Sequence, residues 1–298
     1  MSFSVQQVKT STDIKKFIRL PWKVYEDSPL WIPPLISERE KFLDPSVNPF
    51  LKYSKVDLFL VTSDKHTVVG RIALIENYVH NETLSNRVGF FGMFEVVNDK
   101  QVSDLLLDKA AQWCRERNFS KLIGPVNLST NHECGLLIDG FDTSPVIGIP
   151  YNPYYYSGYF DDWGLIKYKD LVSLRMNLSR IPEYLELAIG RINKRDRFSI
   201  RSFSLKYFDE EIDIIWRIYN ESWSNNWGFI PMSKEEFIYS ANEMKNFIRP
   251  EYCFIAEISG EPVGFSLTLP DINPVLKKMN GRIFPLGWAS FYLNKNKI

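Results

Sequence analysis

The sequence predicts an α/β protein with mixed sheets, arranged as two successive parts. Helices are indicated where apolar residues recur three or four positions apart, as in residues 101–117, and strands where long apolar runs occur, as in residues 87–97. The two patterns alternate along the chain, which is typical of α/β folds. A similar order of elements appears twice, with a Val-Gly pair that ends at Gly70 in the first part and at Gly264 in the second.

The first part is expected to combine a hairpin, a long central strand and an amphipathic helix. Asp99 precedes that helix and suits an N-cap position. The predicted strands cover residues 56–62, 67–75, 87–97, 120–126 and 169–176, and the predicted helices cover residues 13–19 and 101–117.

The second part is expected to place two helices before a second hairpin. Ser233 and Glu236 have capping-box spacing at the start of one helix, and Pro182 stands near the start of another. The predicted helices cover residues 182–192, 209–223 and 233–250, and the predicted strands cover residues 198–206, 252–258 and 262–269. We therefore expect one domain over residues 1–178 and a second over residues 179–298.

Composition narrows the classes of partner and compartment. The 298 residues include 36 Lys plus Arg and 36 Asp plus Glu. This balance gives no bulk attraction to nucleic acid, so we expect no nucleic-acid partner. Three widely spaced cysteines and three scattered histidines offer no metal-ligand spacing, so no metal site is expected. The N-terminus is polar and no apolar run approaches the ~20 residues that cross a bilayer, which predicts a cytoplasmic protein without a transmembrane segment.

Several long strings resemble a bacterial family of tandem GNAT-like (N-acetyltransferase-like) proteins. They are FIRLPWKVYEDSPLWIPPL, NPF, VGRIALI, GFFGMFE, GPVNLSTNHECGLLIDGFD and YNPYYY, and YYYSGYFDDWGLIKYKDLVSLRM is similar to the usual end of a GNAT domain. The resemblance covers roughly residues 15–270. It implies a GNAT-like acyl-CoA N-acyltransferase fold, with one complete N-terminal copy and one incomplete C-terminal copy.

The resemblance also implies a reaction. GNAT enzymes transfer an acyl group from acyl-CoA to an amine, and some relatives are implicated in N-acylation of sphingoid bases, which implies acyl-CoA as co-substrate and a small-molecule or lipid amine as acceptor. The pantetheine arm enters between two splayed parallel strands, and a glycine-containing loop at a helix N-terminus binds the pyrophosphate. A carboxylate or water acts as base, a tyrosine often acts as acid, and a backbone N–H polarises the carbonyl.

The sequence departs from this pattern in two places. The loop NDKQVSD has no glycine, and Asp99 supplies its own carboxylate where phosphate would bind, so we expect the first copy not to bind the CoA pyrophosphate. The second copy is short: Gly70 to Met176 spans 106 positions, whereas only 34 follow Gly264. We therefore expect a truncated second domain without the acyl-CoA loop.

A truncated second domain has a consequence for self-association. The strand at residues 262–269 would lack its usual neighbour and present an open edge, so we expect the chain to be poorly soluble or self-associating and to show no acyl-CoA turnover. The tail GRIFPLGWASFYL, which includes Phe284 and Trp288, is a candidate to fold back over this edge.

Four residues are candidates for catalysis. Glu95 lies near the end of the predicted central strand, His132 and Glu133 lie in the loop NLSTNHECG, and Tyr155 lies in YNPYYY. Carboxylates, histidines and tyrosines of this kind act as general bases and acids. Each has a structural alternative, namely an ion pair, a tightly hydrogen-bonded loop or aromatic core packing. If they act together, we expect them to meet in a cleft between the two halves.

Four further residues are candidates to bind polar groups of a substrate. They are Asn127, Ser129, Asn131 and Tyr154. Turn formation is the structural alternative for the first three, and aromatic packing is the alternative for Tyr154.

Two other classes of function stay open. One is a non-catalytic protein with a degenerate GNAT fold that binds a ligand or a partner. The other is transfer from aminoacyl-tRNA, as in tandem-GNAT peptidoglycan enzymes, which the zero net charge disfavours because tRNA binding normally requires a basic face.

Overall fold

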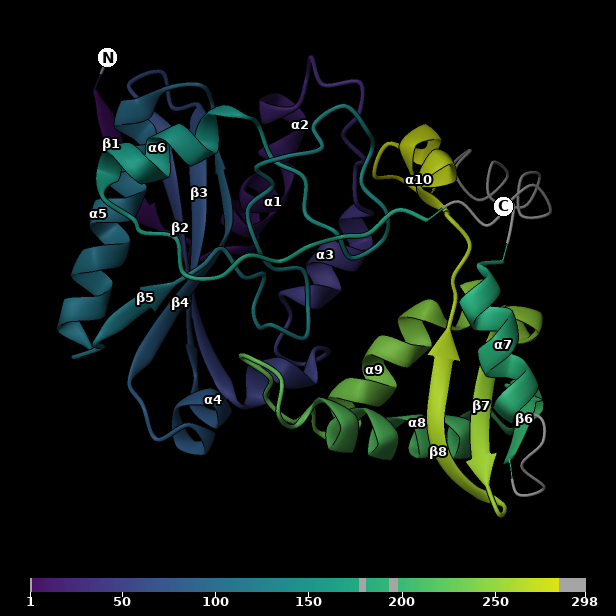
Figure 1. The fold of residues 1–298 in the computed structure, drawn as a ribbon. Helices are drawn as coiled ribbons and strands as arrows, with labels where there is room; N and C mark the ends of the chain where they lie inside the picture. Colours follow the sequence, from purple (N-terminus) through teal and green to yellow (C-terminus); the bar gives the residue numbers. More distant parts are fainter. Residues whose placement is uncertain (1, 177–180, 193–197, 284–298) are drawn as a thin grey trace. The chain divides into compact units, whose positions relative to one another are not determined.

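The computed structural model describes residues 2–176, 181–192 and 198–283, and these residues form two compact units (Figure 1). The first unit contains the described residues up to Tyr168 together with those from Asp271 onward, and the second contains those from Lys169 to Pro270. The division by contacts thus falls ten residues before the sequence-based boundary after residue 178, and the chain returns to the first unit after the second. The domain boundaries at 178 and 179 stay a prediction.

The first unit is built on a five-stranded sheet. In the order in which they pair, its strands are β1 (Phe3–Gln7), β2 (Ser54–Ser63), β3 (Val68–Asn77), β4 (Val88–Val96) and β5 (Lys121–Ile123). All neighbours are antiparallel except β4 and β5, which are parallel. The predicted α/β class with a mixed sheet is confirmed.

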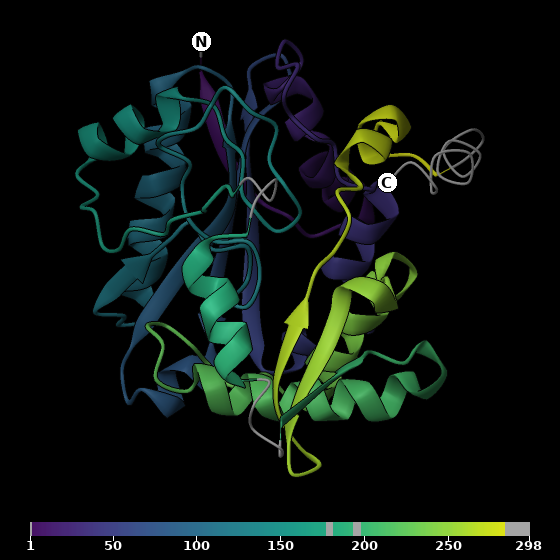
Figure 2. The same cartoon turned by 45° about the vertical axis from the view of Figure 1, so that its right-hand side comes forward.

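Helices cover both faces of this sheet. The described helices of the first unit are α1 (Ser11–Arg19), α2 (Pro21–Val24), α3 (Ile36–Phe42), η1 (Pro49–Lys52), α4 (Tyr78–Thr83), α5 (Lys100–Glu116), α6 (Tyr155–Trp163) and α10 (Asn273–Met279). In Figures 1 and 2, α5 and α6 lie on one face and α1 to α3 on the other. Because both faces are covered, every residue of β4 is buried except Glu95, which is half-buried.

Two apolar clusters hold these layers together. On one face, Leu106 and Trp113 of α5 pack with Tyr156 and Phe160 of α6. On the other, Phe17 of α1 packs with residues from α3, η1 and the sheet. The predicted helix at residues 101–117 is confirmed, and so is its N-cap, since the Asp99 carboxylate accepts a hydrogen bond from the Gln101 N–H at 2.9 Å.

The parallel pair β4 and β5 is short, and the chain beyond β5 stays attached to β4. Pairing covers Val88–Phe90 against Lys121–Ile123. The Val126 N–H then donates to the Phe91 carbonyl at 2.8 Å. A Cβ atom on Gly92 would lie 1.7 Å from the Val126 carbonyl oxygen, so the two backbones touch at a position where only glycine fits. The strand predicted at residues 120–126 is therefore shorter than expected.

The strand predicted at residues 169–176 is wrong. The segment is irregular, and its apolar side chains face solvent, with Val172 78% exposed and Leu174 91% exposed. Its alternating apolar pattern suits a strand, but a strand forms only where a neighbour completes its hydrogen bonds. No strand of the described residues pairs with it.

The second unit has a three-stranded antiparallel sheet and several helices. The strands pair in the order β6 (Phe198–Ser202), β7 (Cys253–Ile258) and β8 (Glu261–Leu267). The helices are α7 (Glu183–Ile192), η2 (Leu205–Tyr207), α8 (Phe208–Trp223), α9 (Lys234–Met244), η3 (Lys245–Phe247) and η4 (Pro250–Tyr252). The predicted capping box of Ser233 and Glu236 is confirmed at the start of α9.

The core of the second unit lies between its sheet and α8. Ile212 and Ile215 of α8 pack against Ile255 of β7 in this core. Among the described strands β8 lies at an edge. The tail expected to cover it, residues 281–293, begins in the first unit, where the Ile36 N–H donates to the Gly281 carbonyl, and from residue 284 onward it lies outside the described residues. Self-association through this edge stays a prediction. The helices of the described chain include none with the length and apolar character needed to cross a bilayer.

The Gly92 contact predicts a stability effect. We expect Gly92→Ala to lower the free energy of unfolding by about 3 kcal/mol, because the methyl group would force apart two hydrogen-bonded backbones. Gly158→Ala in α6 is the matched control, since a Cβ there meets no atom within 4 Å and alanine favours the helix by up to about 1 kcal/mol. The midpoints of urea unfolding compare the two variants. Equal midpoints would show that the Gly92 contact is not a constraint.

Candidate functional site

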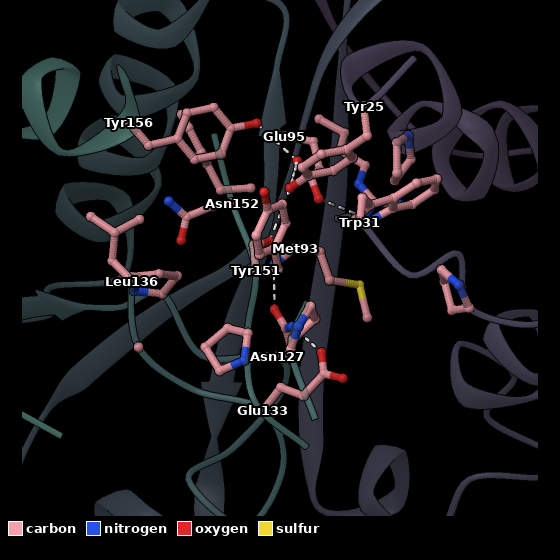
Figure 3. Close-up of a pocket in the computed structure, with 18 of the residues that line it drawn as sticks. Tyr25, Trp31, Met93, Glu95, Asn127, Glu133, Leu136, Tyr151, Asn152 and Tyr156 are labelled. Carbon is pink, nitrogen blue, oxygen red and sulfur yellow. Dashed lines mark hydrogen bonds and ion pairs between the residues drawn. The ribbon is translucent and has the colours of Figure 1, made fainter. Parts of the chain in front are cut away.

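A cavity of ≈ 160 Å³ lies in the first unit, beside the end of β4 (Figure 3). Its walls come from the α1 to α3 region, β3, β4, the segment after β5, the segment that leads to α6, and α6 itself. The charged and amide side chains in its lining are Arg39, Arg71, Glu95, Asn127, Glu133 and Asn152. Tyrosine hydroxyls and apolar side chains complete the lining.

Glu95 is the most constrained carboxyl group of the cavity. Its Oε2 accepts hydrogen bonds from the hydroxyl groups of Tyr156, at 2.8 Å, and Tyr25, at 3.0 Å. Its Oε1 lies 3.7 Å from Nη2 of Arg71, and the Glu95 side chain is 13% exposed. Figure 3 shows both tyrosine rings converging on this carboxylate from opposite sides. Three elements besides β4 therefore contribute contacts to one side chain.

Burial raises the pKa of Glu95 above its ordinary value of 4.5. The charge of Arg71 and the two tyrosine hydrogen bonds oppose this shift, and the charge of Glu133 adds to it. Burial also raises the pKa values of Tyr25 and Tyr156 well above 10.0, so both hydroxyl groups keep their hydrogens. A buried carboxyl with a raised pKa in a cavity is the physical profile of an acid–base group.

Arg71, on β3, balances part of the charge of Glu95 without forming a close pair with it. Its Nη1 donates to the Phe17 carbonyl at 2.7 Å, and its guanidinium lies 4.9 Å from the centre of the Phe17 ring. Its Nε is buried and has no hydrogen-bond partner among the described residues. Contacts with Phe17 of α1 hold Arg71 in place, 3.7 Å from Glu95 Oε1. The ionised form of Glu95 is therefore stabilised less than it would be in a bidentate ion pair.

Asn127 and Glu133 form a second polar group in the cavity. Asn127 Nδ2 donates to Glu133 Oε2 at 3.0 Å, and Asn127 Oδ1 accepts from the Met93 N–H at 2.8 Å. Met93 has φ of 46° and lies where the register between β3 and β4 shifts, so β4 bends at this point. The Asn127 side chain thus accepts the hydrogen bond of the Met93 N–H, which the bend would otherwise leave without a partner.

Three of the sequence-predicted residues, Glu95, Glu133 and Asn127, line the cavity. They meet within the first unit, whereas the sequence led us to expect a cleft between the halves. His132 and Ser129 lie outside the lining: His132 Nδ1 pairs with Ser129 Oγ at 2.9 Å, and the imidazole ring packs edge-on against two phenylalanines. Burial lowers the pKa of His132 to about 4.

The remaining candidates also lie away from the cavity lining. The Asn131 N–H donates to Ser129 Oγ at 3.2 Å, and the Tyr155 hydroxyl donates to the Val96 carbonyl at 2.9 Å. Tyr154 is 72% exposed. Catalytic roles for His132 and Tyr155, and substrate binding by the residues outside the lining, stay predictions.

Sequence reasoning missed Tyr25 and Arg71 as members of the site, and of the three tyrosines in YNPYYY it selected Tyr154 and Tyr155 in place of Tyr156. Tyr25 caps the C-terminus of α2, 70 positions before Glu95, so no local spacing connects them. Tyr156 lies in YNPYYY, the string that drew attention to its neighbours Tyr154 and Tyr155. Among the described residues no group of three or more metal-ligating side chains comes together.

Comparisons with known proteins identify the family. No protein-family model matches the chain. Bacterial ceramide synthase from Caulobacter vibrioides is 34% identical over 288 residues, which cover 96% of this chain and 74% of that protein. Protein YghO from Escherichia coli K12 is 33% identical over 285 residues, which cover 96% and 73%. The chain belongs to the GNAT-like acyltransferase family that includes these two proteins, as its sequence strings had indicated.

Solved structures with a similar arrangement include a ribosomal-protein-alanine N-acetyltransferase from Brucella melitensis biovar Abortus 2308. It is 14% identical, and the match covers 59% of this chain and 100% of that chain with a TM-score of 0.35.

The buried imidazole of His132 predicts a pH-dependent stability. Its pKa falls from 6.5 to about 4 in the folded protein, so between these values the unfolded chain takes up a proton that the folded chain does not. The free energy of unfolding should therefore decrease by up to about 3 kcal/mol as pH falls from 6.5 to 4. His132→Gln should lose this component when urea unfolding is measured across that range. An identical pH dependence in the variant would contradict the assignment.

Proposed function

We propose that the chain is an N-acyltransferase that transfers an acyl group from acyl-CoA to the amine of a lipid, with Glu95 as the general base. This proposal departs from the expectation of no acyl-CoA turnover that the short second copy gave. The observation that carries the proposal is the buried Glu95 carboxyl group, with its raised pKa, inside a cavity of the first unit. The relative named bacterial ceramide synthase supports a sphingoid amine as the acceptor, since a ceramide is the amide of a sphingoid base and a fatty acid.

The proposed step needs one proton to be removed. An ammonium group must lose a proton before its nitrogen lone pair can attack the thioester carbonyl. The C–N bond then forms, the nitrogen gives up a second proton as the C–S bond breaks, and the leaving thiolate takes up that proton, so the net change is the one proton that the base accepts. A base works best when its pKa lies near the working pH, and burial moves Glu95 in that direction.

The cavity lining supports a lipid acceptor. Apolar side chains surround the polar group at Glu95; Ile18, Trp31, Leu43, Phe94 and Ile149 are among them. A hydrocarbon chain suits such walls, while the carboxylates of Glu95 and Glu133 suit a cationic amine.

Three features argue that the first unit does not hold acyl-CoA in the usual GNAT manner. The backbones of Gly92 and Val126 are in contact, and the family resemblance implies that a pantetheine arm would pass beside β4 at this level. The Met93 N–H at the bend of β4 is bonded to Asn127, so it is not available to a thioester carbonyl. Asp99 caps the N-terminus of α5, which disfavours an incoming phosphate. We infer that the acyl donor reaches the cavity by another route.

The contact between Gly92 and Val126, which on this proposal leaves no space for a pantetheine arm, also favours a second candidate function. In this alternative the chain is a non-catalytic protein that binds a lipid amine in the cavity. Binding of the amine to the Glu95 cavity is common to both candidates, and only turnover separates them.

A matched pair of variants tests the proposed reaction. Purified protein is mixed with palmitoyl-CoA and sphinganine, and the N-acyl product is measured by mass spectrometry. Glu95→Gln should lower kcat by about 10²–10⁴, because it removes the proton acceptor while keeping the shape of the side chain. Glu76→Gln, the same change on β3 at a residue outside the cavity lining, should retain activity.

Two results would decide against this function. Turnover by Glu95→Gln equal to that of Glu76→Gln would exclude Glu95 as the base. Saturable binding of sphinganine without any product would favour the non-catalytic alternative.

A further inference from the structure

We propose that Tyr25 is a positioning residue whose hydroxyl group turns between Glu95 and the main-chain carbonyl of Tyr151, and so keeps Glu95 hydrogen-bonded both before and after it accepts a proton. The inference rests on the proposed function, in which Glu95 is the proton acceptor. It assigns a role to a residue that sequence reasoning did not select.

The geometry around the Tyr25 hydroxyl offers two acceptors for one hydrogen. Its oxygen lies 3.0 Å from Glu95 Oε2 and 3.0 Å from the Tyr151 carbonyl oxygen. A tyrosine hydroxyl donates one hydrogen and can accept another hydrogen bond. When Glu95 is ionised, both neighbours of this hydroxyl are acceptors, and only one of them can receive its hydrogen.

Protonation of Glu95 resolves this competition. The new hydrogen on Oε2 needs an acceptor, and the Tyr25 oxygen lies within reach. Tyr25 then accepts from Glu95 and donates to the Tyr151 carbonyl. In this state the Glu95 carboxyl group, the Tyr25 hydroxyl and the Tyr151 carbonyl each have a partner, which matters because an unpaired buried polar group costs free energy.

Tyr156 is less suited to this exchange. Its oxygen accepts from the Val96 N–H at 2.8 Å. Its alternative acceptor, the Val96 carbonyl, is 3.3 Å away and already receives the Tyr155 hydroxyl at 2.9 Å. Tyr156 therefore remains a donor to Glu95, and Tyr25 is the neighbour that can reverse.

Aromatic packing fixes the ring of Tyr25 so that only its hydroxyl hydrogen moves. Tyr25 is 4% exposed, and its ring stacks on that of Trp31, with ring centres 4.7 Å apart and planes 9° apart. Trp31 meets the edge of Trp22, and Trp22 Nε1 donates to Asn280 Oδ1 at 2.8 Å. Asn280, at the C-terminal end of α10, thus helps to hold the stacked rings of Tyr25 and Trp31 in place through Trp22.

Among the described residues, the charged and titratable groups with the largest influence on the pKa of Glu95 lie in the same unit. Arg71 approaches from β3, Glu133 from the segment after β5, Tyr156 from α6 and Tyr25 from the end of α2. Burial keeps Tyr25 protonated, so its hydrogen is present in both states of Glu95.

Infrared difference spectroscopy reads the exchange without requiring turnover. Protein with ¹³C at the tyrosine main-chain carbonyls is titrated across the protonation of Glu95. The Tyr151 carbonyl should shift to lower frequency when Glu95 is protonated, because it gains a hydrogen bond. Tyr151→Phe moves that carbonyl out of the labelled set and so identifies the band. Tyr159→Phe, which removes a hydroxyl of α6 that bonds to Asn98, is the control and should leave the shift intact.

The near-isosteric variant Tyr25→Phe and the variant Glu95→Gln should both abolish the pH-dependent shift. In the acylation assay Tyr25→Phe should lower kcat roughly tenfold with KM unchanged, as loss of one hydrogen bond to a charged group implies. A Tyr151 band that does not move with pH in the wild-type protein, or one that still moves in Tyr25→Phe, would overturn the proposal. The band reports on Tyr25 even if no acyl transfer occurs, so failure of the proposed function is a separate result.

Discussion

The first unit depends on the enclosure of one carboxyl group. Glu95 projects from a strand whose other residues are buried, and its oxygens are met by Tyr25 from α2, Tyr156 from α6 and Arg71 from β3. A buried carboxylate without such partners would be strongly destabilising, so the positions of these elements and the charge of Glu95 are coupled. The packing that forms the cavity is also the packing that raises the pKa of this group.

The contact between Gly92 and Val126 gives the second constraint. It keeps the segment after β5 on β4, and that segment carries Asn127 and Glu133 into the cavity. We propose that the same contact fills the space in which GNAT enzymes receive the pantetheine arm. On the proposed account, the first unit has kept the position of the base and lost the slot for the acyl donor. Recognition of the amine and binding of acyl-CoA would then lie in different places.

Helices and strands were predicted correctly where a periodic apolar pattern extended over many residues or a capping residue marked the start of a helix. The helix after Asp99 and the strand that contains Glu95 were both identified, because each carries a strong local pattern. Residues 169–176 carry a similar pattern and form no strand, since pairing is decided by neighbours that local spacing does not reveal. Glu95, Asn127 and Glu133 were selected because they are polar residues within or beside apolar segments that resemble the GNAT-like family. Tyr25 was not selected, because it lies 70 positions before Glu95 in the sequence and only the tertiary fold brings the two side chains together.

A direct test of the account is the pKa of Glu95, measured by ¹³C NMR of the glutamate side-chain carboxyl carbons, with Glu95→Gln identifying the resonance. Glu95 should titrate with a pKa above its ordinary value of 4.5, because burial outweighs the charge of Arg71 and the two tyrosine hydrogen bonds. A titration at or below 4.5 would mean that Arg71 and the tyrosines hold Glu95 as a stable ion. That result would contradict its role as the base and leave it a structural ion pair.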